Sequence, residues 1–207
     1  MDPALIRFGA TAFVMLIVVV NPVAVAPIFV AVTDGMARPE RTGVLNRAVA
    51  LSFGVAMFFL FVGPMLLQYL GVTVNAFAIS GGLLLFVIAF RMLFGQRSTA
   101  RPAEGGREDV AIFPLTIPQL VGPGTIATIL VLATQARGDW TKVGVVVLAI
   151  VCVYLVSWPT LYSADWVMHK MGEGTVQVVT RVLGVVLAAL AVQYVLNGVA
   201  GYVAALR

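Results

Sequence analysis

The strongest constraint on this chain is a series of apolar runs, each long enough to cross a lipid bilayer as a helix. Such a helix needs about 20 mostly apolar residues. We predict spans at about 5–33, 47–69, 76–94, 112–134, 143–162 and 176–203. With 61% hydrophobic residues, 11% charged residues and a mean hydropathy of +1.03, the chain leaves no room for a large extramembrane domain. We therefore predict an all-α membrane protein with a single transmembrane domain over residues 1–207.

Other features exclude several function classes. The net charge is +4, but the basic residues lie at the ends of apolar runs and form no stripe, so we expect no nucleic-acid partner. The single cysteine, Cys152, allows neither an internal disulfide nor a clustered-thiol metal site. The spans contain no paired aspartates, no serine–histidine pair and no HExxH motif. We therefore expect the protein not to be an enzyme and to need no cofactor.

The orientation in the membrane is predicted from lysine and arginine, because short loops rich in them stay cytoplasmic. If every run crosses once, one side carries Arg38, Arg41, Arg47, Arg91, Arg97, Arg101, Arg107, Lys170 and Arg181. The other side carries only Arg7, Arg137, Lys142 and Arg207. We predict a multi-pass protein of the cell (inner) membrane with both termini non-cytoplasmic. The argument fails if the first and fourth runs are re-entrant hairpins.

The chain contains two copies of one motif. Shifted by 101 residues, VNPVAVAPIFVAVTD (20–34) aligns without a gap on VGPGTIATILVLATQ (121–135), and six of the fifteen positions are identical. Because each copy begins a unit of three crossings, the second unit has the opposite orientation in the membrane. We predict two inverted three-helix repeats, at about 1–94 and about 111–207, joined by a polar linker at about 95–110.

The motif carries helix breakers at matching positions, so we expect the first helix of each repeat to be broken. A broken helix backbone is tolerated in a bilayer only where it is buried in protein or lines a cavity. The amides that begin a half-helix can hold an anion, and freed carbonyls can hold a cation. A small zwitterion matches both. The candidate substrate-binding residues are Asn21, Pro22, Pro27, Gln119, Gly122, Pro123, Gly124, Thr125 and Thr128.

The carboxylates bear on the coupling ion. All of them lie in loops or near span ends, so no buried carboxylate relay is visible. Proton coupling would have to use Asp34, Asp165 or the substrate's own titration. Sodium could instead be held transiently by carbonyls and hydroxyls near Asn21 and Thr125, although we expect no resident metal. The sequence leaves the choice between proton and sodium open.

These motifs resemble those of the MarC family of six-span membrane proteins. The resemblance rests on NPVAVAPIF, with Asn21, Pro22 and Pro27, on IPQLVGPGTIAT, and on TRVLGVVLAALAVQYVLNGV near the C-terminus. It implies cation-coupled transport of small neutral amino acids, with a fold related to amino-acid exporters. The alternative is a passive channel, or a facilitator or exporter for another small polar metabolite. The Gly, Ala and Thr residues at the breaks do not favour the large aromatic-lined cavity of a drug-efflux site.

The predicted topology can be tested with reporter fusions. Reporters placed after Arg207 and within residues 96–106 should report opposite sides of the membrane, with the internal one cytoplasmic. Agreement between the two reporters would show that the parity argument is wrong.

Overall fold

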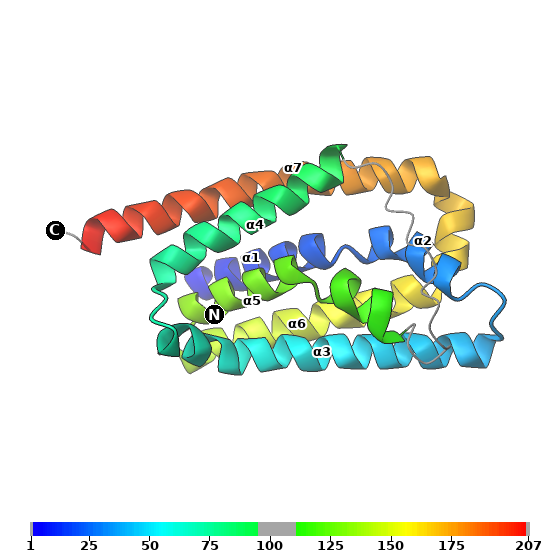
Figure 1. The fold of residues 1–207 in the computed structure, drawn as a ribbon, viewed down its shortest axis with the longest axis horizontal. Coiled ribbons are helices and arrows are strands. Elements are labelled where there is room, and N and C mark those ends of the chain that lie inside the picture. The colour runs from blue at the N-terminus through cyan, green and yellow to red at the C-terminus, as the bar shows by residue number, and fades with distance from the viewer. Residues whose placement is uncertain (1, 95–110, 206–207) are drawn as a thin grey trace.

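The computed structural model describes residues 2–94 and 111–205, which form helices joined by short turns (Figure 1). The first half contains α1 (Pro3–Val20), α2 (Pro22–Val32), α3 (Arg38–Tyr69) and α4 (Val74–Phe94). The second half contains the π-helix η2 (Ile112–Leu120), α5 (Pro123–Gln135), α6 (Trp140–Tyr162) and α7 (Ala164–Ala205). The all-helical prediction is confirmed for these residues. The predicted linker at 95–110 lies outside them.

Five of the described helical segments are long and apolar enough to cross a membrane: Pro3–Val32, Arg38–Tyr69, Val74–Phe94, Trp140–Tyr162 and Gly174–Ala205. The predicted fourth span is not one of them, because it is divided into η2 and the shorter α5. Pro114 and Pro118 lack the amide hydrogen that an α-helix needs, which accounts for the irregular helix before the break. The six expected spans therefore correspond to five long apolar segments, the first of which is itself broken between α1 and α2, and to one segment divided into η2 and α5.

Two predicted boundaries were wrong. Helix α3 begins at Arg38, about nine residues before the expected start, because hydropathy marks only the apolar part of a helix and not its polar first turns. Helix α7 begins at Ala164 and not near residue 176. It bends at Gly172, whose φ of 66° lies in the left-handed region that glycine adopts without steric cost. The polar stretch before the last apolar run is therefore helical too.

The two broken segments lie in the interior of the bundle. Half of the most apolar window of Pro3–Val32 is buried, against 22–33% in the other four long segments. Nine of the 13 residues of α5 are buried as well. In Figure 1, α4 and α7 run along one edge and α3 and α6 along the other, with α1 and α5 between them. The other helices therefore cover most of both breaks, although Pro123 at the second break is exposed.

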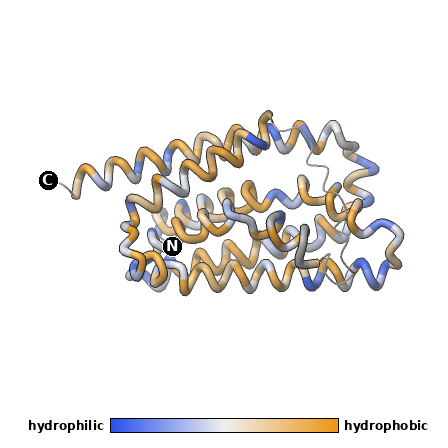
Figure 2. The backbone as a smooth tube through the Cα atoms, in the orientation of Figure 1, coloured by the Kyte–Doolittle hydropathy of each residue, from blue (hydrophilic) through white to orange (hydrophobic). Residues whose placement is uncertain are grey.

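Polarity follows the long axis of the bundle. Figure 2 shows apolar residues along the helices and hydrophilic residues gathered toward the bundle ends. The beginning of α1 and the end of α7 lie toward the same end (Figure 1). This arrangement is the one expected of a multi-pass membrane protein. Which end faces the cytoplasm, and whether a pseudo-two-fold axis relates the halves, stay predictions.

Helices α4 and α7 pack closely through glycines. A Cβ atom built on Gly82 would lie 2.7 Å from the carbonyl oxygen of Ala191. One built on Gly198 would lie 2.8 Å from the carbonyl oxygen of Asn75. Backbone atoms cannot move aside as a flexible side chain can, so only glycine fits at these positions. Small residues at such contacts are the usual basis of helix association in membranes.

We expect Gly82→Ala to destabilise the protein by about 1–3 kcal/mol, because its methyl group would overlap the α7 backbone. Gly54→Ala is the matched control, since no atom lies within 4 Å of a Cβ at this helical position. It should raise stability by about 0.5–1 kcal/mol. Thermal unfolding of the detergent-solubilised variants measures both. Equal unfolding midpoints for the two variants would contradict the close α4–α7 contact.

Candidate functional site

The first break is centred on Asn21, which ends α1 and begins α2. Its φ of 42° and ψ of 65° are left-handed, a conformation that asparagine adopts more readily than most residues. Its amide donates to the Ile17 carbonyl at 2.9 Å, and its side-chain oxygen accepts from the Ala24 amide at 3.3 Å. Asn21 is only 5% exposed. The sequence prediction of a broken first span is therefore confirmed, and Asn21 caps both helices.

The prolines around this break free backbone carbonyls. Pro22 has no amide hydrogen, so the Val18 carbonyl loses its regular helical donor. Pro27, half-buried inside α2, does the same to the Val23 carbonyl. The Val18 carbonyl lies in the last turn of α1, where the helix dipole adds partial negative charge, whereas Val23 lies in the first turn of α2. The first break thus offers groups that attract a cation or an ammonium group.

The second break separates η2 from α5. The Val121 amide donates to the Thr116 carbonyl at 2.9 Å, which closes the π-helix, and Gly122 is then extended at φ −97° and ψ −177°. The first α-helical hydrogen bond runs from the Ile126 amide to the Gly122 carbonyl at 3.0 Å. The Gly124 amide precedes that bond and has no acceptor within the helix, and no side chain caps α5. The second predicted break is confirmed, and its uncapped amides attract an anion.

The two breaks approach each other in the core. A Cβ atom on Gly124 would lie 3.1 Å from Val19 Cγ1, at the end of α1, and 2.5 Å from Ile88 Cδ1 of α4. The start of α5 therefore packs directly against the last turn before the first break. In this conformation, side chains fill the space beside Gly124. A ligand bound there requires Val19 or Ile88 to move.

The remaining predicted residues differ in how deeply they are buried. Pro22 and Thr125 are buried at the breaks, with Thr125 only 2% exposed, and Pro123 is exposed at the first position of α5. The Thr128 hydroxyl is fully buried but donates to the Gly124 carbonyl at 2.9 Å. Gln119 is half-buried on η2, before the break. Their role in binding stays a prediction.

Sequence reasoning missed Tyr154 of α6. Its buried hydroxyl lies 3.3 Å from the Leu120 carbonyl, at the end of η2, and 3.3 Å from the Ser52 carbonyl of α3. The available signal was a tyrosine in the middle of an apolar run, since a buried Tyr hydroxyl normally has a hydrogen-bond partner. Tyr154 therefore ties α3 and α6 to the second break and helps to hold the irregular backbone in place.

Within residues 2–94 and 111–205, no three His, Cys, Asp or Glu side chains come together as metal ligands would. The buried polar side chains of this part of the chain are an asparagine, four threonines and two serines: Asn21, Thr33, Ser52, Thr116, Thr125, Thr128 and Ser157. The polar chemistry of the core is therefore that of amides, hydroxyls and backbone carbonyls.

Comparison with known proteins places the chain among membrane proteins of one family. It is 30% identical to a UPF0056 membrane protein of Methanocaldococcus jannaschii over 95% of this chain and 98% of the relative. It is 28% identical to the UPF0056 membrane protein YvbG of Bacillus subtilis (94% and 95%) and 29% identical to YhcE of Escherichia coli (91% and 90%). No solved structure matches the chain. The family model described as "MarC family integral membrane protein" matches residues 6–203, and the chain therefore belongs to the MarC family.

Proposed function

We propose that the protein is a secondary transporter of small neutral amino acids such as alanine or glycine. The observation that carries this proposal is the contact between the two buried breaks, where Gly124 packs against Val19. One break presents uncapped amides and the other freed carbonyls, so opposite partial charges lie close together in the core. The zwitterion's carboxylate would bind at the amides of Gly124 and Thr125. Its ammonium group would face the carbonyls near Asn21.

The size of the site supports a small substrate. Gly122 and Gly124 flank Pro123 at the second break, and Gly124 has no room even for a methyl group unless Ile88 or Val19 moves. A substrate with a side chain of valine size or more would need a much larger displacement. Interiors as closely packed as this one accommodate added volume at a cost of about 1–3 kcal/mol per extra group. Selection for glycine and alanine follows from this steric limit.

A transport cycle requires the closed packing to open. The two halves, related as inverted repeats in this proposal, would move against each other around the breaks and expose them to either side in turn. We propose that a cation, sodium or a proton, is coupled to this movement. The protein would act in the cell (inner) membrane with both termini non-cytoplasmic. A passive channel, or a facilitator or exporter for another small polar metabolite, is the alternative that the same half-helix architecture permits.

The steric role of Gly124 can be tested with a rescue experiment. Gly124→Ala should lower alanine uptake into proteoliposomes at least tenfold, and should also destabilise the protein because its methyl group meets Ile88 Cδ1. Adding Ile88→Ala should restore stability but not uptake, since the methyl group still blocks the ligand. Ile88→Ala alone is the control and should transport. Recovery of both properties in the double variant would reduce Gly124 to a packing role.

The polar groups give a second prediction. Asn21→Ala should weaken uptake and lower stability, because alanine lacks the cap to Ala24 and adopts the left-handed conformation less readily. Thr125→Ala should weaken uptake with little loss of stability. Thr134→Ala is its matched control, because that hydroxyl is bonded to the Val131 carbonyl at 2.8 Å, more than two helical turns from the break. Equal uptake by the two threonine variants would remove Thr125 from the site.

Gradients in the same liposomes separate transporter from channel. We expect labelled alanine to accumulate above its outside concentration under a sodium or a proton gradient, and only under the one that is coupled. Flux that merely equalises the concentrations under both gradients would favour the channel. Glycine and leucine serve as small and oversized competitors.

A further inference from the structure

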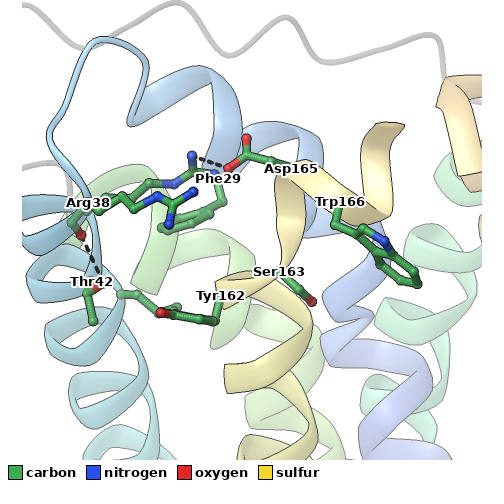
Figure 3. Close-up of a pocket in the computed structure, with 9 residues that line it drawn as sticks. Phe29, Arg38, Thr42, Tyr162, Ser163, Asp165 and Trp166 are labelled. Carbon is green, nitrogen blue, oxygen red and sulfur yellow. Dashed lines mark hydrogen bonds and ion pairs between the residues drawn. The ribbon is translucent and has the colours of Figure 1, made fainter. Parts of the chain in front are cut away.

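A second polar pocket lies away from the breaks, where α2, α3, α6 and α7 meet (Figure 3). Its volume is about 250 Å³, slightly below the range of pockets that take drug-sized ligands. The residues that matter here are Phe29, Arg38, Arg41, Tyr162, Asp165 and Trp166. It lies at the arginine-rich end of the bundle, which the charge distribution predicts to be cytoplasmic. Its size suits a single small metabolite.

Arg41 provides an unsatisfied donor in this pocket. Its Nη1 donates to Asp165 Oδ2 at 2.5 Å, and its guanidinium carbon lies 4.9 Å from the centroid of the Phe29 ring. These contacts fix the side chain, which is 20% exposed. Its Nη2 is buried and has no hydrogen-bond partner among the described residues. A buried guanidinium nitrogen without an acceptor is unfavourable, and a carboxylate is the acceptor that matches its geometry best.

Charges of both signs line the pocket. Arg38 and Arg41 are positive, and Asp165 is negative with 63% of its side chain exposed, so its carboxylate is open to a second partner. A simple anion placed here would meet Asp165, and a simple cation would meet two arginines. A zwitterion satisfies both signs at once. The rings of Phe29 and Tyr162 can contact its side chain, whereas the Trp166 ring points away from them at the edge of the pocket (Figure 3).

We propose that this pocket is a second binding site for free α-amino acids, with the carboxylate on the guanidinium groups of Arg38 and Arg41 and the ammonium group on Asp165. It would capture the amino acid at the arginine-rich end before or after its passage through the breaks. Its aromatic lining tolerates larger side chains than the glycines of the breaks do. The charges of the pocket by themselves favour a zwitterion. The inference rests on the proposed transport function only where it identifies this zwitterion as an amino acid.

Trp166, which follows Asp165 at the edge of the pocket, provides a nearby readout of binding. The experiment uses the full chain in detergent, with Trp140→Phe as background to reduce the signal of the exposed tryptophan at the other end of the bundle. Titration with glycine, alanine, serine or leucine should change the fluorescence saturably, whereas acetate and methylamine, each with one charge, should not. Adding Trp166→Phe should remove the change. No saturable response to any amino acid would overturn the proposal.

Charge variants test the assigned contacts. Arg41→Gln and Asp165→Asn should each weaken the apparent affinity at least tenfold. Arg137→Gln is the matched control, because this arginine bonds to Gln68 at 2.9 Å outside the pocket and should bind normally. Thermal unfolding identifies any variant that fails to fold. In that case Arg38→Gln replaces the failed variant, because Arg38 is more exposed than Arg41. Equal affinities in the Arg41→Gln, Arg38→Gln and Arg137→Gln variants would show that the arginines do not bind the carboxylate.

Two further comparisons separate this proposal from others. Gly124→Ala should lose transport but keep the Trp166 response, so failure of the pocket and failure of the transport proposal are distinguishable. Phosphatidylethanolamine also carries an ammonium group and an anion, and it can reach the end of a bundle. A fluorescence response to this lipid in nanodiscs, with no response to free amino acids, would assign the pocket to a lipid headgroup and overturn the proposal.

Discussion

A peptide group that leaves helical geometry inside a bilayer needs a hydrogen-bond partner, and lipid offers none. This constraint organises the whole molecule. Asn21 and Gly122 interrupt two membrane segments, and both segments are placed where other helices cover them. The long helices α3, α4, α6 and α7 form the outside, where backbone hydrogen bonds are made within each helix apart from the bend of α7 at Gly172. The breaks thus decide which helices are central.

The surroundings of the breaks combine rigid and movable contacts. Asn21 closes one break with its own amide group, and Tyr154 lies against the carbonyl that ends the π-helix before the other. By contrast, Ile88 meets Gly124 with Cδ1, the far end of its side chain, and Val19 meets it with a methyl group and not with its backbone. The irregular backbone is therefore held in position while the space beside it can open. This combination suits a site that must be exposed and closed in turn.

The pocket around Arg41 and the breaks follow different chemistry. The breaks use partial charges of backbone groups, which can be buried in the core at modest cost, whereas the pocket uses full charges near the end of the bundle where water and headgroups reach. In the two proposals, full charges at the end would attract and orient a zwitterion, and partial charges in the core would hold it without trapping it. Both proposed sites would recognise the same pair of groups, so a ligand of one chemical class could use both.

The sequence by itself determined the class of protein, the places of most helices and both helix breaks. The length of an apolar run is a local property of the sequence. The missing amide hydrogen of Pro22 and the conformational freedom of Gly122 and Gly124 are local properties too, so none of these predictions needs tertiary context. Membership of the MarC family was equally readable from NPVAVAPIF and IPQLVGPGTIAT.

Only the tertiary structure decided which residues meet. The contact of Gly124 with Val19, the position of Tyr154 against Leu120 and the pairing of Arg41 with Asp165 join segments 34 to 124 residues apart, and no local pattern encodes such pairs. The polar first turns of α3 escaped hydropathy because they lie beyond the apolar part of that helix. Local chemistry sets where a helix starts, bends or breaks, whereas side-chain packing across the bundle sets what each break faces.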